Sequence, residues 1–382
     1  RERHAVYDSG YSPTVAVIVP AYNEAKVIVQ TITSLLASDH PPHFEIVVVD
    51  DGSTDATYSR VKEAFGDEAR VRLFSKANGG KAAALNFGVA HTDAEIVIAL
   101  DADTIFARDT MSKLVRHFAD PQTGAVAGNA KVGNRINLLT RWQALEYITS
   151  QNLDRRAFNL LNCVAVVPGA VGAWRRELVL KAGGFTHETL AEDADLTMVI
   201  RKMGYSIAYE DKAIALTEAP DTVRGFVKQR YRWMYGTLQA AWKHKDALFR
   251  PRYGALGFLA LPNVFIFQVL FPLISPAMDL LMLVTVAMTA VDRWQHPAEF
   301  SADSLKRAVF YYAIFMTMEF LAAALAFILE YKENRRLLVW LFLQRFFYRQ
   351  LMYYVAIKST FASLRGIAVG WNKLERKATV KA

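Results

Sequence analysis

Residues 44–55, FEIVVVDDGSTD, decide the fold class. The run from Phe44 to Val49 is apolar but for Glu45 and lacks the alternation of a strand with one face in water, so we predict a strand buried on both faces. Asp50 and Asp51 follow at its carboxyl end, before a glycine turn and an amphipathic stretch. This order is typical of a parallel α/β sheet, which binds ligands beyond the carboxyl ends of its strands.

The same pattern recurs through the first third of the chain. Further strands are predicted at residues 14–20, 71–75 and 94–100, and helices at residues 24–38, 54–66, 80–90 and 109–119. The resulting β-α-β-α order predicts an α/β fold with a doubly wound, Rossmann-like and mostly parallel sheet. We therefore expect the functional side chains directly after the strands.

The composition changes near Tyr253, after which runs of roughly 20 apolar residues have the length that crosses a bilayer. Residues 307–329 are a clear candidate span, and residues 336–357 are a weaker one because they contain Arg345 and Arg349, which either line a polar interior or snorkel to a surface. Residues 253–290 contain three prolines and are interpreted as an interfacial or re-entrant helix followed by a span, or as a broken pair of spans.

The formal net charge of +8 is concentrated in one segment, because residues 224–252 contain eight Lys or Arg against one acid, Asp246. Such a patch favours an anionic lipid surface, another polyanion or a phosphorylated small molecule. We do not expect nucleic acid as a partner, since the patch adjoins apolar spans. The single cysteine, Cys163, excludes an intramolecular disulfide. Because position 1 is Arg and no leader follows, we expect a trimmed chain or a piece of a longer one.

Two pairs of acids follow predicted strands. Asp50 or Asp51 can accept hydrogen bonds from a ribose or a base, although a turn that caps the next helix explains the same motif. Asp101 and Asp103, in IVIALDADT, leave their strand two positions apart and can aim at one point. Their hard oxygen ligands suit Mg²⁺ or Mn²⁺ beside a diphosphate, and a helix cap is again the alternative.

Residues 78–88, NGGKAAALNFG, raise the question of a phosphate-binding loop. The Walker A motif needs Gly where Ser75 stands and Ser or Thr where Ala82 stands, so a P-loop ATPase is excluded at this site. A flexible Asn-Gly-Gly turn that presents Lys81 and free amides at a helix start is a candidate anion contact. A simple joint between loop and helix is the alternative.

Two further motifs precede the apolar half. HETLAEDADL (187–196) places Asp193 among first-turn acids, which either serve the helix dipole or hold an acid that accepts a proton from an attacking hydroxyl. QRYRW (229–233) contains Arg232, whose guanidinium can form two parallel hydrogen bonds with a diphosphate. It also contains Trp233, whose flat ring can stack on a sugar. An interfacial belt of basic and aromatic residues is the alternative for this motif.

In this order and ahead of apolar spans, DDGSTD, NGGKAAALNFG, DAD, EDADL and QRYRW resemble the motifs of the processive family 2 membrane glycosyltransferases, which include cellulose, chitin-oligosaccharide, hyaluronan and poly-N-acetylglucosamine synthases. The resemblance covers residues 15–242 firmly and the remainder more loosely. WQALEY (142–147), PGAVGAWRR (168–176) and the tail motifs RQLMYYVAIKS and GWNKLER are most similar to poly-N-acetylglucosamine synthases. The resemblance implies a cytosolic GT-A domain over residues 1–240, and interfacial helices with about three to four transmembrane helices over residues 241–382.

The resemblance also implies roles for single residues. On the donor side, Asp50 or Asp51 contacts the uridine and Lys81 lies near the donor. Asp101 and Asp103 engage the nucleotide and the metal ion, Mg²⁺ or Mn²⁺.

For the reaction itself, Asp193 matches the general base of the family's ED motif. Gln229, Arg232 and Trp233 match the Q-x-x-R-W signature, which makes Gln229 and Arg232 donor-binding, gives Arg232 a catalytic role on the diphosphate, and assigns the acceptor site to Trp233. The sequence departs from the family pattern at Ala191, where Thr is commoner, and in having no paired spans before the first strand.

The predicted function is that of an inverting, processive glycosyltransferase in the bacterial inner (plasma) membrane. It transfers N-acetylglucosamine from UDP-N-acetylglucosamine to a growing β-linked polysaccharide and couples synthesis to export. The alternatives are hyaluronan, chitin-oligosaccharide or glucan synthesis, a single transfer to a lipid acceptor, and a regulatory subunit without catalysis. Expected partners are the UDP-sugar, the polysaccharide, membrane lipids, and a deacetylase domain or accessory subunit, since some relatives carry a deacetylase in the same chain.

Overall fold

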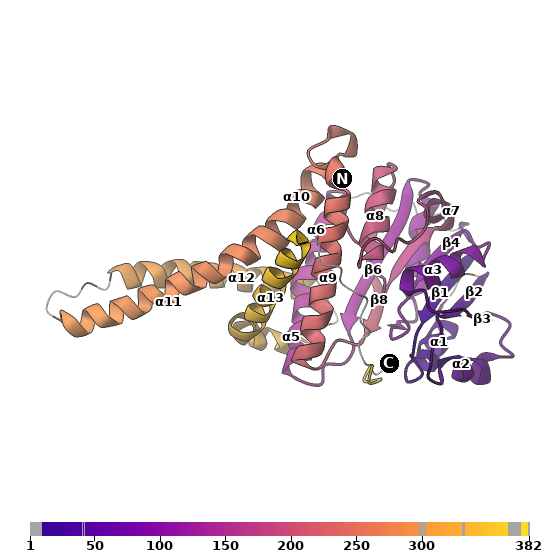
Figure 1. The fold of residues 1–382 in the computed structure, drawn as a ribbon, viewed down its shortest axis with the longest axis horizontal. Coiled ribbons are helices and arrows are strands. Elements are labelled where there is room, and N and C mark those ends of the chain that lie inside the picture. The colour runs from indigo at the N-terminus through magenta and orange to yellow at the C-terminus, as the bar shows by residue number, and fades with distance from the viewer. Residues whose placement is uncertain are drawn as a thin grey trace.

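The computed structural model describes residues 10–39, 41, 43–297, 301, 303–330, 333–365 and 376–380. Within them, eight strands form one sheet in the order β3-β2-β1-β4-β7-β6-β8-β5 (Figure 1). The strands are β1 (Val15–Ala21), β2 (Phe44–Asp50), β3 (Val71–Ser75), β4 (Ile96–Ala99), β5 (Ile105–Phe106), β6 (Thr123–Val132), β7 (Gly172–Arg175) and β8 (Ser206–Thr217). Of the tail motif GWNKLER, only Arg376 lies among the described residues.

One half of the sheet is parallel. β1 pairs with β2 on one side and with β4 on the other, so that Val15 lies opposite both Phe44 and Ile96, and β3 extends the sheet beyond β2. These are the strands that the apolar runs of the sequence predict. The predicted α/β fold with a mostly parallel sheet is therefore confirmed.

The other half of the sheet mixes strand directions. β7 is antiparallel to both β4 and β6, β6 runs parallel to β8, and β5 is antiparallel to β8. β6 and β8 span 10 and 12 residues, and their register shifts between Gly128 and Asn129. These strands are not among those predicted from the sequence.

Helices cover both faces of the sheet (Figure 1). They are α1 (Ile28–Leu36), α2 (Thr57–Phe65), α3 (Lys81–Ala90), α4 (Thr110–Val115), α5 (Leu138–Glu146), α6 (Leu153–Leu160), α7 (Arg176–Lys181), α8 (Glu192–Lys202) and α9 (Val223–Lys243). The first four lie within the predicted helical ranges. In α1, Ile28, Ile32 and Leu35 form the buried stripe that the amphipathic pattern requires.

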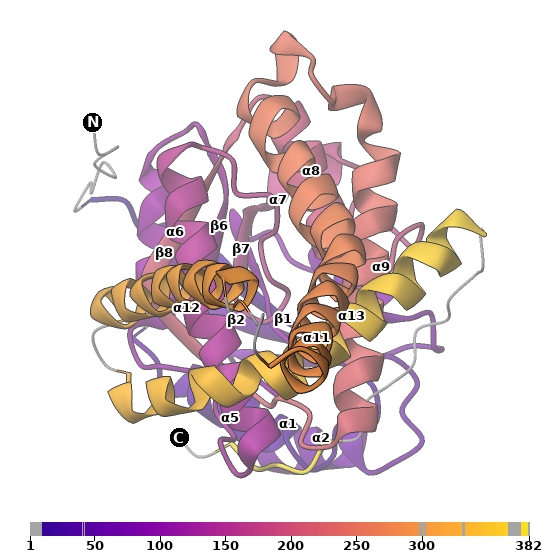
Figure 2. The same cartoon turned by 90° about the vertical axis from the view of Figure 1, so that its left-hand side faces the viewer.

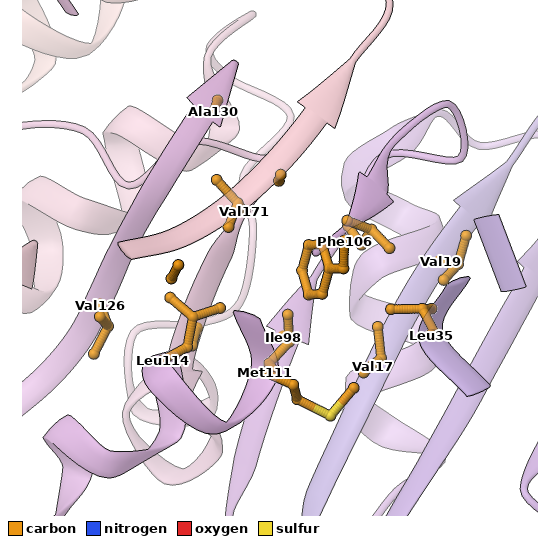
Figure 3. Close-up of a cluster of buried hydrophobic side chains, with 14 of the residues drawn as sticks. Val17, Val19, Leu35, Ile98, Phe106, Met111, Leu114, Val126, Ala130 and Val171 are labelled. Carbon is orange, nitrogen blue, oxygen red and sulfur yellow. The ribbon is translucent and has the colours of Figure 1, made fainter. Parts of the chain in front are cut away.

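Both faces of the sheet are buried, as the continuous apolar strands predict. Figure 3 shows the cluster on one of these faces. On β1, Val17 belongs to the cluster on one face and Ile18 to the cluster on the other. Gly88 lets α3 press onto the second face, because a Cβ at this position would lie 2.4 Å from Cγ2 of Ile18. This close packing fixes the start of α3, and with it Lys81, at the edge of the sheet.

Two long helices, α11 (Phe271–Gln295) and α12 (Asp303–Leu329), project away from the sheet as an arm (Figures 1 and 2). In the described part of the chain, Leu256–Gln295 and Leu305–Leu329 are the two helices long and apolar enough to cross a membrane. Many of their large apolar side chains are exposed. An exposed apolar surface of this extent needs lipid or protein to cover it.

The helix from residue 256 to residue 295 is continuous despite its prolines. π-helical turns at Leu256–Ala260 and Val264–Leu270 flank α10 (Leu261–Asn263) and precede α11, so a broken pair of spans is not what forms.

The weaker candidate span forms a 3₁₀ turn, Arg335–Trp340, followed by α13 (Leu341–Leu364), which packs against α9. Arg345 on α13 lies 2.6 Å from Glu319 of α12 and therefore faces protein. The total number of spans stays a prediction.

Candidate active site

A cavity of about 780 Å³ lies beyond the carboxyl ends of the parallel strands. It brings together side chains from the strand ends, α3, α8 and α9. The predicted site residues that line it are Asp51, Lys81, Asp101, Asp103, Asp193, Gln229, Arg232 and Trp233. Asp50 does not line it. Folding therefore gathers nearly all of the predicted set into one space.

Asp51 shapes the loop that precedes α3. Its buried carboxylate accepts hydrogen bonds from Nζ of Lys76 at 2.6 Å and from the backbone N–H groups of Gly79 at 3.0 Å and Gly80 at 2.7 Å. Gly80 has φ of 84°, which favours glycine. Asp50 lies behind this loop, where one carboxylate oxygen accepts from Ser75 at 3.3 Å and the other is buried with no hydrogen-bond partner among the described residues.

Lys81, the first residue of α3, bridges two acids. Its Nζ lies 2.7 Å from Asp101 and 3.0 Å from Glu192. Burial by itself would lower the pKa of Lys81, but the charges of Asp101, Glu192 and Asp193 outweigh it and raise the pKa. Lys81 is thus a permanent cation at the centre of the cavity, which is what an anion contact requires.

The pKa values of Asp103 and Asp101 are shifted in opposite directions. Burial, reinforced by the charges of Asp101 and Glu218, raises the pKa of Asp103 although Arg376 opposes the shift. For Asp101, burial would also raise the pKa, but the charge and hydrogen bond of Lys81 lower it. Lys81 therefore favours the charged form of Asp101, whereas burial disfavours the charged form of Asp103.

The acidic pair fits a hard divalent cation. Oδ2 of Asp103 is buried and receives no hydrogen bond within the described residues, although Nη2 of Arg376 forms an ion pair with it at 2.8 Å. No group of three or more His, Cys, Asp or Glu in the described chain is arranged to hold a metal on its own. Mg²⁺ and Mn²⁺ often take one or two carboxylates and complete their shell with substrate phosphates, a requirement that Asp101 and Asp103 meet.

Arg376 reaches the cavity from the end of the described chain. The segment 376–380 is held by Glu218, whose carboxylate accepts from the backbone N–H groups of Lys377 at 2.9 Å and Ala378 at 3.1 Å and from the hydroxyl of Thr379 at 3.0 Å. Arg376 also donates to the carbonyl of Glu218 at 2.9 Å. The segment 376–380, which follows the apolar helices in the chain, thus places a guanidinium beside Asp103.

Asp193 lies at the start of α8. One carboxylate oxygen accepts from the backbone N–H of Gly169 at 3.0 Å. Burial, together with the charge of Glu192, raises the pKa of Asp193 to about 6, while Lys81 counteracts the shift. An acid with a pKa near 6 is ionised at neutral pH and still basic enough to accept a proton, as a general base must.

The QRYRW motif lies on α9, and both of its arginines line the cavity. Arg230 is buried, pairs with Glu146 at 2.7 Å and lies 4.4 Å from the ring centre of Trp233. Arg232 lines the cavity. Burial lowers the pKa of Arg232, and the charges of Glu192 and Asp101 counteract part of the shift. The first arginine of the motif therefore braces the tryptophan, and the second presents its charge to the acids.

Several residues that line the cavity carry no predicted role in the sequence motifs. Glu192 was visible beside Asp193 but was interpreted only as a first-turn acid. Tyr147, whose ring lies 6.3 Å from that of Trp233, belongs to a quoted motif to which no role was given. Arg376 also belongs to a quoted motif without a predicted role, because no local pattern shows that a residue so late in the chain returns to the cavity.

Cations and acids that share one cavity fit a phosphorylated substrate, and the family match is consistent with this chemistry. Residues 13–236 match the family described as "Glycosyltransferase like family 2", which covers more than half of the chain. The chain belongs to this glycosyltransferase family.

Among individual proteins, the chain is similar to the poly-beta-1,6-N-acetyl-D-glucosamine synthases of Staphylococcus aureus (strain COL) and Staphylococcus epidermidis. The identities are 30% and 28% over 223 residues, which cover 58% of this chain and 54% of each relative. The chain thus spans about half the length of the curated relatives it matches.

The fold is similar to that of the mannosyltransferase PcManGT from Pyrobaculum calidifontis, solved in complex with GDP-Man and Mn²⁺. The TM-score is 0.65 at 24% sequence identity, and the alignment covers 96% of this chain and 91% of the other. This likeness confirms the predicted GT-A fold.

Proposed function

We propose that this protein transfers N-acetylglucosamine from UDP-N-acetylglucosamine to the non-reducing end of a growing β-linked polysaccharide. The observation that carries the proposal is the cavity in which a general base of raised pKa, Asp193, lies beside a lysine, an arginine and an acidic pair. The similarity to poly-beta-1,6-N-acetyl-D-glucosamine synthases favours this donor sugar.

On the donor side, we assign the diphosphate to Lys81 and Arg232 and the uridine to the Asp51 loop. Asp51 is favoured over Asp50 because it lines the cavity. Gln229, buried beside Arg230 on α9, completes this wall. Asp101 and Asp103 would hold Mg²⁺ or Mn²⁺, and the Mn²⁺ in PcManGT supports a divalent cation. Such an ion, when bound, neutralises charge on the diphosphate.

For the transfer step, Asp193 accepts the proton of the acceptor hydroxyl as its oxygen attacks the anomeric carbon. The bond to the diphosphate breaks in the same displacement, and Arg232 and Lys81 stabilise the negative charge that builds on the leaving UDP. A single in-line displacement needs no protein nucleophile and inverts the anomeric configuration. Trp233, held by Arg230, offers the flat face on which the acceptor sugar stacks.

We further propose that the enzyme is integral to the plasma membrane of a bacterium, with the sheet domain in the cytosol. The two exposed apolar helices and the basic segment of residues 224–252 support this placement. Processive elongation would then deliver the polymer to the membrane helices for export. A deacetylase domain or accessory subunit is the expected further partner.

The test is product analysis. Purified full-length chain in lipid nanodiscs is incubated with Mn²⁺ or Mg²⁺ and either radiolabelled UDP-N-acetylglucosamine or UDP-glucose, and the product is sized and digested with specific glycosidases. A long product from UDP-N-acetylglucosamine is expected. A single sugar that extracts into organic solvent would instead support the lipid-acceptor alternative, and absence of transfer from any UDP-sugar would overturn the proposal.

A further inference from the structure

Two neighbouring arginines on α6 have opposite surroundings. The guanidinium of Arg156 is neutralised by ion pairs with Asp211 and Glu330. Arg155 lines the cavity instead, and its buried Nη1 has no hydrogen-bond partner within the described residues. A buried donor without a partner costs free energy, so a position of this kind is retained where a ligand supplies the acceptor.

The backbone before Arg155 is irregular. The π-helical turn Tyr147–Asn152 separates α5 from α6, and turns of this kind change the direction of the side chains that follow. Polar atoms without partners in the described chain gather here, because Asn152 is fully buried with both side-chain polar atoms unpaired and the hydroxyl of Tyr209 is also unpaired. Arg155, Tyr147 and Asp193 line the same cavity, and burial lowers the pKa of Arg155.

Arg155 therefore belongs to the acceptor side of the cavity. Tyr147 connects it to Trp233, whose ring lies 6.3 Å away, whereas the donor-side cations Lys81 and Arg376 pair with Asp101 and Asp103. A ligand group that meets Arg155 is thus carried by the sugar that receives the transfer.

The wall beside Arg155 has a polar part, formed by Ser150, Gln151 and Asp154, and an apolar part. Phe158 lies three positions further along α6 and lines the cavity, together with Val164 and Val166 of the following loop. Phe158 packs against the buried cluster that contains Val164. A guanidinium next to a small apolar wall matches a ligand with a carbonyl oxygen and a methyl group a few bonds apart, which is an N-acyl group on an amino sugar.

We propose that Arg155 is a specificity-determining residue that binds the acyl oxygen of an N-acylated amino sugar at the acceptor end, while Phe158 and Val164 enclose the acyl methyl. This inference rests on the proposed function and deepens it. A carboxylate, as in a uronic acid, fits less well because it would approach Asp193, whose negative charge the reaction requires. A neutral carbonyl oxygen avoids this repulsion and still accepts a charge-assisted hydrogen bond.

The experiment compares acceptor oligosaccharides of one length that end in N-acetylglucosamine, glucosamine, glucose or glucuronate. Elongation by one sugar is measured for the parent, Arg155→Met and Arg155→Lys, with Arg156→Met as the matched control. Donor hydrolysis without acceptor and UDP binding are recorded in parallel. Arg155→Met should lower kcat/KM for the N-acetylated acceptor about 10- to 100-fold, the usual worth of a hydrogen bond to a charged group. The loss should be smaller for the other acceptors than for the N-acetylated one, and Arg155→Lys should recover part of it.

Arg156→Met should lower the unfolding temperature without changing the preference among acceptors. An equal loss of all acceptors in Arg155→Met would show a structural role and overturn the proposal. If Arg155→Met lowered kcat/KM for the glucuronate acceptor alone, Arg155 would bind a carboxylate rather than an acyl oxygen, and the proposal would be wrong. If the parent transfers from no UDP-sugar, the proposed function fails, and equilibrium binding of the same oligosaccharides to parent and Arg155→Met still decides whether the subsite discriminates the acyl group.

Discussion

Two clusters of buried charge in this molecule differ in how fully their members are paired. The cavity cluster consists of Lys81, Asp101, Asp103, Glu192, Asp193, Arg232 and Arg376, and the junction cluster consists of Lys131, Arg135, Arg156, Glu330 and Glu333. In the junction cluster, Glu330 meets Lys131 at 2.8 Å and Arg156 at 3.1 Å. Glu333 meets Lys131 at 3.1 Å and Arg135 at 2.7 Å.

The cavity cluster is less balanced, because Lys81 is shared between two acids and Asp193 has a raised pKa. None of the five junction residues lines the cavity. The contrast shows that a cluster of buried charges is not by itself evidence of a catalytic site. Saturated pairs hold two parts of a fold together, whereas shared cations and perturbed acids beside a cavity mark a reaction site.

The largest expected effect is on the cavity side. Asp193→Asn should lower transfer about 10²- to 10⁴-fold, the usual contribution of a general base, and leave UDP binding intact. Because burial disfavours the charged carboxylate, the amide should unfold at no lower temperature than the parent at pH 7. Single-turnover transfer, UDP titration and thermal unfolding measure the three quantities.

The control is Asp195→Asn on the same helix. Asp195 is buried against His244 and Lys243 and does not line the cavity, so its loss should lower stability more than chemistry. Equal transfer rates in Asp193→Asn and the parent would remove Asp193 from its role.

The junction cluster should respond in the opposite way. Glu330→Ala leaves Lys131 buried without its closest partner and should destabilise the fold by about 3–5 kcal/mol. UDP binding by the folded fraction should be unchanged. Glu177→Ala, which removes an exposed pair with Lys181, serves as the control and should change stability by less than about 1 kcal/mol. A Glu330→Ala protein that melts like the parent would contradict the assignment.

Activity and stability should depend on pH in different ranges, because the two clusters titrate differently. Since Asp193 must be ionised to accept a proton, kcat/KM should fall about tenfold per pH unit below its pKa of about 6. The junction should survive this range, because Arg135 and Lys131 hold the pKa of Glu333 below its ordinary value of 4.5 against the effect of burial. The stability that Glu333 contributes is therefore present above pH 4.5 and lost only as the pH falls through the lowered pKa. Parallel loss of activity and near-UV circular dichroism near pH 6 would refute this separation.

Arg376→Ala should sharpen the description of the cavity cluster. Removing the cation beside Asp103 should tighten binding of Mn²⁺ alone about tenfold, since the two cations compete for one carboxylate. Calorimetric titration without donor measures the affinity. Lys377→Ala, which leaves Arg376 in place, should bind Mn²⁺ like the parent, and unchanged affinity in Arg376→Ala would show that Asp103 is not a ligand.

The smallest effect is expected at Trp233. Trp233→Ala should lower elongation about 2- to 10-fold more than donor hydrolysis, the range for one aromatic contact. Trp242→Ala on the same helix is the control, because that side chain is 63% exposed. Equal loss of elongation and hydrolysis in Trp233→Ala would argue against an acceptor platform.

The sequence predicted the parallel half of the fold well, for a physical reason. Strands buried on both faces are continuous apolar runs, and residues 14–20, 44–50 and 71–75 coincide with β1, β2 and β3 to within one residue. β6, TGAVAGNAKV, is fully buried but rich in small residues, so no comparable signal marks it. Strand direction in the second half depends on pairing across long loops, which local patterns do not encode.

The site was predictable where a residue follows a strand or opens a helix, as Asp51, Asp101 and Lys81 do. It was not predictable where tertiary structure supplies the neighbour. The packing roles of Asp51 and Arg230 and the approach of Arg376 depend on contacts between distant segments. Arg155 and Arg156 are adjacent and chemically identical, and only the fold distinguishes the one that faces the cavity.

The junction cluster also has a mechanical meaning. Glu330 directly follows α12 and forms an ion pair with Lys131 of β6. Ala130, the residue before Lys131 on β6, forms part of the cavity wall. In a bilayer, a change in the tilt of α12 would reach the cavity wall through these ion pairs. We expect turnover to vary with lipid acyl-chain length even when every catalytic group is intact.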